Sequence, residues 1–148
     1  MSKLGFVVEG FNDEAKLMKL FPDASFAVTK GTRMNNRVKM DVSKLLKECD
    51  EILLMLDPDE AGDQLSSMVK ENFPELKQVH LEREHCLCQR GRKLKVGVEH
   101  ASVEYLKRKL KENNVIVWYF LLWLIFLGII KLKFWVYLLF GSYGFESQ

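Results

Sequence analysis

The stretch Ile52-Leu53-Leu54-Met55-Leu56-Asp57-Pro58-Asp59 indicates the fold of this 148-residue chain. Its five consecutive apolar residues are typical of a buried strand. Pro58 fixes its own φ and keeps Asp57 out of the helical region. Extended backbone turns alternate residues to the same side, so the two carboxylates are expected to face one point about 6–7 Å apart. Hard divalent cations prefer such oxygen ligands, although Asp-Pro-Asp also occurs in plain surface turns.

Strand-like and helix-like segments alternate on both sides of this stretch. Apolar runs predict four strands, at Leu4–Val8, Ser25–Val28, Ile52–Leu56 and Gln78–Leu81. Helical spacing predicts helices over Asp13–Phe21, Arg37–Glu48, Ala61–Phe73 and Ser102–Glu112, the last with Ser102 as N-cap. The alternation predicts an α/β fold with a mainly parallel sheet of about four strands and helices on both faces. Residues 82–96 are predicted to form a long polar loop.

Three loops that carry acids, glycines and hydroxyl groups directly follow predicted strands. They are Glu9-Gly10, Thr29–Thr32 and Asp57–Asp59. In open parallel sheets the ligand crevice lies outside the carboxyl ends of the strands. We therefore expect the three loops to meet at one edge of the sheet.

These loops carry a resemblance to the Toprim domain. The matching residues are Val7-Val8-Glu9-Gly10 with Asp13, then Gly31, then Asp57-Pro58-Asp59 with Gly62. A later run, Gly97-Val98-Glu99-His100-Ala101-Ser102, resembles more narrowly the ribonuclease M-five family, bacterial nucleases that mature 5S ribosomal RNA. The resemblance covers roughly residues 4–112. Residues 1–112 are therefore expected to form a Toprim catalytic domain.

The resemblance implies a Mg²⁺-dependent endoribonuclease that cleaves the double-stranded stem of a 5S rRNA precursor. It implies Glu9, Asp57 and Asp59 as catalytic and metal-binding residues, with general acid or base as an alternative role for Glu9. Two ions about 3.5–4 Å apart could activate a water and stabilise the leaving oxygen. Gly10 and Gly31 would let the backbone approach a phosphate closely. The implied partners are the precursor RNA and a ribosomal protein bound to it.

Several other polar residues have two interpretations. Arg90, Arg92, Lys93 and Lys95 could bind RNA phosphates, or simply belong to a solvated loop. His100 could contact RNA, orient a loop or make a structural hydrogen bond.

Two further sets of residues could contribute to a metal site but fit other roles better. Glu60 and Asp63 fit helix N-terminal acids better than additional groups at the metal site. A zinc site from His80, His85, Cys86 and Cys88 is disfavoured, because Cys-x-Cys lacks the usual spacer and has no second pair.

Bulk composition limits the location and the partners. The net charge of +2 gives no global field that would attract nucleic acid, so any such surface must be local. Three cysteines, an odd number, and the absence of a signal-peptide pattern favour a reducing, cytoplasmic compartment.

Residues 113–148 differ from the rest of the chain. From Val115 to Phe140 only Gly128, Lys131 and Lys133 interrupt an apolar run, which as one helix would be about 39 Å long. The run could be a membrane anchor that tethers a cytoplasmic domain, a degenerate or frame-shifted replacement of the family's RNA-recognition region, or a buried apolar helix.

The sequence also fits two rival functions. One is another Toprim activity, such as DNA nicking or priming, against which the Gly97–Ser102 run argues. The other is a non-catalytic, membrane-tethered Toprim protein that binds nucleic acid.

Overall fold

The computed structural model describes residues 3–31 and 33–113. The predicted C-terminal apolar helix and membrane anchor at 115–140 lie outside these residues. Within the described ranges, none of the helices has the length and apolar character needed to cross a membrane. The chain divides into two units between Lys109 and Leu110. The description below concerns the first unit.

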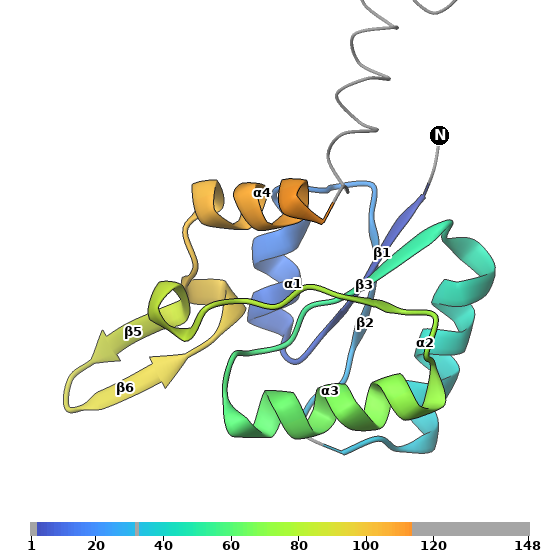
Figure 1. Cartoon of the computed structure of the whole chain (residues 1–148), viewed down its shortest axis with the longest axis horizontal. Helices are drawn as coiled ribbons and strands as arrows, with labels where there is room; N and C mark the ends of the chain where they lie inside the picture. Colours follow the sequence, from blue (N-terminus) through green and yellow to red (C-terminus); the bar gives the residue numbers. More distant parts are fainter. Residues whose placement is uncertain (1–2, 32, 114–148) are drawn as a thin grey trace, which may run out of the picture. The chain divides into compact units, whose positions relative to one another are not determined.

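The centre of this unit is a four-stranded, wholly parallel sheet with strand order β2-β1-β3-β4 (Figure 1). The strands are β1 (Leu4–Val8), β2 (Ser25–Val28), β3 (Glu51–Leu54) and β4 (Lys77–Gln78). The predicted parallel α/β sheet is confirmed. β1 and β3 lie in its middle, which explains why their sequences are continuously apolar rather than alternating.

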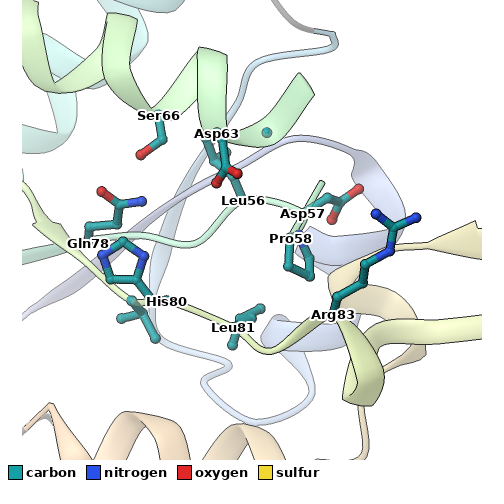
Figure 2. Close-up of a pocket in the computed structure, with 11 residues that line it drawn as sticks. Leu56, Asp57, Pro58, Asp63, Ser66, Gln78, His80, Leu81 and Arg83 are labelled. Carbon is teal, nitrogen blue, oxygen red and sulfur yellow. The ribbon is translucent and has the colours of Figure 1, made fainter. Parts of the chain in front are cut away.

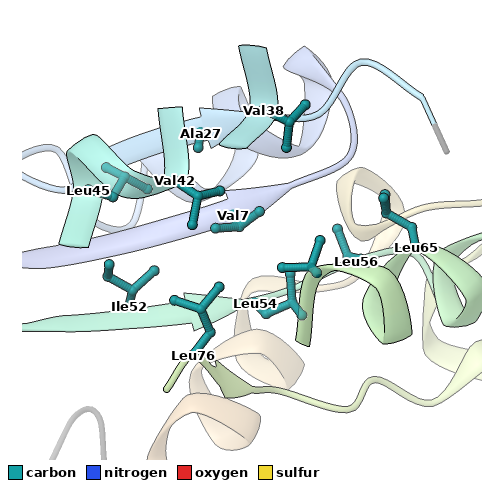
Figure 3. Packing of buried hydrophobic residues seen from close by; sticks show 11 residues of the cluster. Val7, Ala27, Val38, Val42, Leu45, Ile52, Leu54, Leu56, Leu65 and Leu76 are labelled. Carbon is teal, nitrogen blue, oxygen red and sulfur yellow. The ribbon is translucent and has the colours of Figure 1, made fainter. Parts of the chain in front are cut away.

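Helices α2 (Asn36–Glu48) and α3 (Glu60–Asn72) cover one face of the sheet (Figures 1 and 3). One buried cluster contains the inward residues of both helices and of three strands: Val7, Ala27, Val38, Val42, Leu45, Ile52, Leu54, Leu65 and Val69. Burying each such side chain contributes roughly 1.5–3 kcal/mol. This packing holds the carboxyl ends of β1 and β3 side by side.

Helix α1 (Phe11–Met18) covers the opposite face. Because side chains alternate along β1, Phe6 points away from the cluster that contains Val7. The Phe6 ring lies 5.4 Å from the ring of Phe21 and 5.5 Å from that of Phe26. Helices therefore lie on both faces, as predicted.

Side-chain caps explain where the helices begin. Asn35 Oδ1 accepts a hydrogen bond from the Val38 N–H at the start of α2. Ser102 Oγ accepts one from the Tyr105 N–H at the start of α4 (Val103–Glu112), so the predicted N-cap is confirmed. Helix α1 begins at Phe11, two residues before the predicted Asp13, because the Asp13 carboxylate caps the preceding turn through the Gly10 N–H.

The prediction of a long polar loop over residues 82–96 is wrong. The segment forms a 3₁₀ turn, η1 (Arg83–Cys86), and an antiparallel hairpin of β5 (Leu87–Arg90) and β6 (Lys93–Val96). Gly91 has φ of +63° at the first position of the two-residue turn, a conformation that favours glycine. The hairpin is largely exposed, so its strands lack the apolar run that identifies buried strands. A second 3₁₀ turn, η2 (Val98–His100), leads into α4.

Candidate active site

The carboxyl ends of β1, β2 and β3 open into a hollow of about 450 Å³. Glu9 and Gly10 follow β1, Gly31 follows β2, and Asp57 follows β3, so the predicted meeting of these loops is confirmed. Gly97 and Glu99, from the turn before α4, complete the lining. We call this depression the acidic hollow.

Negative charge accumulates in and beside the acidic hollow, where Lys30 is the one basic residue among the described lining residues. Burial, followed by the charges of Asp13, Glu9 and Asp59, raises the pKa of Asp57 from 3.8 to about 7, although a hydrogen bond from Val98 opposes the shift. Burial, then Asp59 and Asp13, also raises the pKa of Glu9. Among the described residues, no ion pair neutralises Glu9 or Asp57. A bound cation would relieve this repulsion.

The individual carboxylate oxygens have different partners. Asp57 Oδ1 accepts a hydrogen bond of 2.9 Å from the Val98 N–H, and Asp59 Oδ1 accepts one of 2.8 Å from the Gly62 N–H. These bonds fix each carboxylate through one oxygen. Glu9 Oε2 is buried and has no hydrogen-bond partner. A buried polar atom without a partner is rare and costly, so this oxygen favours a ligand.

Asp13 has a structural position that distinguishes it from the other acids. Its side chain is 4% exposed, and its oxygens accept hydrogen bonds of 2.9 Å from the Gly10 N–H and the Glu99 N–H. Asp13 therefore joins the β1–α1 turn to the turn before α4. It is absent from the predicted site residues, although its position three residues after an N-cap is the signal that could have indicated it.

The run Gly97–Ser102 packs its backbone against the acids. Two successive N–H groups, those of Val98 and Glu99, donate to Asp57 and Asp13 respectively. The Gly97 N–H donates to the Cys86 carbonyl oxygen. His100 Nε2 lies 3.2 Å from Glu99 Oε1, but the alignment does not form a hydrogen bond. The run thus positions the loop that carries Asp57.

Two glycines are needed where they stand. A Cβ on Gly62 would overlap the carbonyl oxygen of Asp57, so the first turn of α3 can approach the Asp57 loop only with glycine there. Gly31 has φ of +124° and lines the acidic hollow. Gly10, the third glycine of interest, donates its N–H to Asp13 and lines the same hollow.

Asp59 sits at the start of α3 as its N-cap rather than in the lining of the acidic hollow. Glu60 and Asp63 lie in the first turn of α3, where acids interact favourably with the helix dipole. Asp63 also lines a second hollow of about 200 Å³, to which Asp57 and Pro58 contribute as well (Figure 2). His80 and Arg83 contribute to its polar wall.

The metal ligands predicted from sequence are only partly assembled. Within residues 3–31 and 33–113, no three His, Cys, Asp or Glu side chains converge as a metal-binding group. The zinc interpretation is therefore unsupported: His85 stacks on Tyr105 with ring centroids 4.3 Å apart, and Cys86 is buried. For Mg²⁺, the oxygen donors, the mutual repulsion of the acids and the unpaired Glu9 Oε2 fit a hard cation. Ligation by Glu9, Asp57 and Asp59 stays a prediction.

The remaining predicted residues lie on a neighbouring surface. Arg90 and His100 line a groove beside the acidic hollow. Arg92, Lys93 and Lys95 are exposed on the turn and second strand of the hairpin.

Residues 5–86 match the Toprim domain family. This chain belongs to the Toprim family. The matched range includes Glu9, Asp13, Asp57 and Asp59. A solved structure described as a small TOPRIM domain protein from Bacillus stearothermophilus superposes with a TM-score of 0.56, at 22% identity, over 76% of this chain and 89% of that one. This likeness concerns the fold.

Curated relatives extend the similarity through the Gly97–Ser102 region. The chain is 32% identical over 105 residues to Ribonuclease M5 of Bacillus cereus, covering 71% of this chain and 53% of that protein. It is 33% identical over 101 residues to Ribonuclease M5 of Bacillus subtilis, covering 68% of this chain and 52% of the relative. The Toprim chain thus spans about half the length of these relatives.

Proposed function

We propose that this protein is a Mg²⁺-dependent endoribonuclease that cleaves the double-stranded stem of a 5S rRNA precursor. The observation that carries the proposal is the buried, unpaired Glu9 Oε2 in a hollow shared with Asp57. The similarity to proteins named Ribonuclease M5 supports RNA as the substrate. The proposed location is the cytoplasm, and the proposed partners are the precursor and a ribosomal protein bound to it.

Glu9, Asp57 and Asp59 would hold the metal. When bound, Mg²⁺ would supply activation of a water and neutralisation of charge on the reacting phosphate. Glu9, whose pKa is raised by burial and nearby acids, is also suited to accept or donate a proton.

The surrounding residues would position substrate and acids. Gly10 and Gly31 would allow backbone to approach a phosphate, and the positive φ of Gly31 disfavours any larger residue there. Asp13 and the N–H groups of Val98 and Glu99 would keep the Asp57 loop aligned with the β1–α1 turn.

Cleavage of a 5S precursor by the purified chain tests the proposal. With Mg²⁺ the chain should cut within the double-stranded stem, and Asp59→Asn should abolish cutting. Asparagine keeps an oxygen that can cap α3 through the Gly62 N–H, so the variant removes charge rather than the helix cap. Asp63→Asn, on the exposed first turn of the same helix, is the matched control and should cut normally.

The rival functions predict different results. Equal cutting by wild type and Asp59→Asn would refute the proposed metal site. Preferential cutting of a DNA duplex of the same sequence would assign another Toprim activity, and binding of RNA without turnover would assign a non-catalytic role.

A further inference from the structure

A groove of about 500 Å³ lies between α1 and the β5–β6 hairpin. Figure 1 shows the hairpin (yellow) next to α1 (blue). Asn12 and Glu99 line both this groove and the acidic hollow, so the two depressions adjoin. We call it the α1–hairpin groove.

One wall of the groove is a single face of α1. Its lining residues are Asn12, Ala15, Lys16 and Lys19. Residues three, four and seven positions apart lie on the same side of a helix. Asn12 lies at the end of α1 next to the acidic hollow, and the two lysines follow toward its far end.

The other wall is one face of the hairpin. Cys88 and Arg90 line the groove, and alternate residues of a strand share a face. The strand register pairs Cys88 with Lys95 and Arg90 with Lys93. Because directly opposed residues project to the same side, Arg90, Lys93 and Lys95 belong to one exposed basic face.

The groove therefore concentrates positive charge in a chain whose net charge is only +2. In the part of the chain that the structure describes, Lys16, Lys19 and Arg90 form no ion pair. The carboxylate in the lining, Glu99, lies 3.2 Å from His100 at the junction with the acidic hollow. These three basic side chains in the lining, with Lys93 and Lys95 on the adjoining face of the hairpin, suit a polyanion.

The acidic hollow that adjoins the groove has an exposed aromatic ring, Phe11, in its lining. Phe11 is 57% exposed and lines the acidic hollow, with Lys30 Nζ 4.6 Å from its ring centroid. Exposed aromatic rings next to basic grooves stack on unpaired nucleobases, which a precursor RNA offers where its strands leave the double-stranded stem. The ring favours a nucleic acid over an acidic peptide, which need not carry a flat ring that could stack on Phe11.

We propose that the α1–hairpin groove binds the sugar–phosphate backbone of a nucleic acid strand, through Lys16 and Lys19 on one wall and Arg90, Lys93 and Lys95 on the other. This inference rests on the proposed function, because the strand would continue into the acidic hollow where a phosphodiester is cut. It adds the α1 lysines to the hairpin residues that the sequence indicates.

Binding of a short RNA duplex in EDTA tests the groove without cleavage. The double variant Lys16→Gln/Lys19→Gln is compared with Lys44→Gln/Lys47→Gln, which removes two lysines of the same spacing from α2 on the opposite side of the sheet. Each lost phosphate contact lowers the slope of log K against log salt by about 0.9 and, at 0.1 M salt, weakens binding by roughly eightfold. The α1 variant should therefore bind at least tenfold more weakly, with a slope smaller by about 1.8. The control should match wild type.

Equal affinity of the two double variants would overturn the proposal. Displacement of the RNA by polyglutamate as effectively as by competing RNA would also overturn it, because the groove would then be a site for acidic protein. If the chain binds RNA as described but never cuts it, the proposed function is refuted while the proposal that the groove binds RNA is supported.

Cross-linking gives the position of the strand independently of affinity. Cys88 lines the groove, Cys49 lies at the end of α2, and Cys86 is buried. A photo-reactive group attached to Cys88 in a Cys49→Ser background should cross-link to bound RNA, whereas the same group on Cys49 in a Cys88→Ser background should not. Equal cross-linking from both positions would contradict the proposal.

Discussion

Replacing Asp57 by asparagine is expected to stabilise the metal-free protein at alkaline pH. Asp57 has a pKa of about 7 in the folded chain, raised from 3.8 chiefly by burial and then by its acidic neighbours. Between these values the folded state holds a proton that the unfolded state has released. Wild-type stability therefore falls as pH rises through this window, and the loss is complete above about pH 7.

The size of the effect follows from the shift. About three pH units at 1.36 kcal/mol each would give ~4 kcal/mol. Because Asp57 remains partly exposed, solvent screening reduces this, and we expect about 2 kcal/mol at pH 8. Asparagine keeps an oxygen that can accept the Val98 N–H, so the hydrogen bond is preserved.

Urea unfolding in EDTA at pH 5 and pH 8 measures this difference. From pH 5 to pH 8, the free energy of unfolding of Asp57→Asn should rise relative to that of wild type. The exposed control Asp63→Asn should change with pH as wild type does. Mg²⁺ at ten times its Kd should then add ~1.4 kcal/mol to wild type and less to Asp57→Asn. Parallel loss of stability by wild type and Asp57→Asn would refute the reasoning.

Three further substitutions test the structure around the site. A change from glycine to alanine usually stabilises a helix, but Gly62→Ala should lower the free energy of unfolding by more than about 1 kcal/mol and weaken cation binding, because the new Cβ would overlap the Asp57 carbonyl oxygen. A higher melting temperature for this variant would contradict the expectation. Asn35→Ala should lower the free energy of unfolding by ~1 kcal/mol, measured in urea, since the Val38 N–H loses its cap; no change would argue against that cap. Tyr105→Phe should cost ~1 kcal/mol in the same assay, because the Glu82 N–H loses the hydroxyl that accepts its 2.6 Å bond; full stability would show that this bond contributes nothing.

The sheet was predictable from sequence because its central strands are buried on both faces. Leu53 and Leu54, which point to opposite faces of β3, are each 0% exposed. Both faces of this strand are therefore apolar, which gives the continuous apolar run seen in the sequence. The absence of an apolar run led to the wrong prediction of a loop where the hairpin forms. Its strands bury little, so their pairing depends on a two-residue turn at Gly91 rather than on an apolar pattern.

The loops of the candidate site were predictable from topology, because residues after parallel strands share an edge. Asp13 was predictable only in part: its spacing from the N-cap Gly10 indicates the bond to the Gly10 N–H, but its second bond is to Glu99, 86 residues later. Spacing along one strand or helix cannot reveal such a pairing. Nor could sequence place Lys16 and Lys19 opposite Arg90, because that requires the hairpin to pack beside α1.

Binding of Mn²⁺, a spectroscopic substitute for Mg²⁺, tests the central claim most directly. Electron paramagnetic resonance counts free and bound Mn²⁺ without any need for RNA or turnover. We predict that wild type and Asp63→Asn bind the ion alike, and that Glu9→Gln, which neutralises the unpaired buried carboxylate, binds it at least tenfold more weakly. Equal Mn²⁺ affinity in wild type and Glu9→Gln would contradict the assignment of this hollow as a metal-dependent active site.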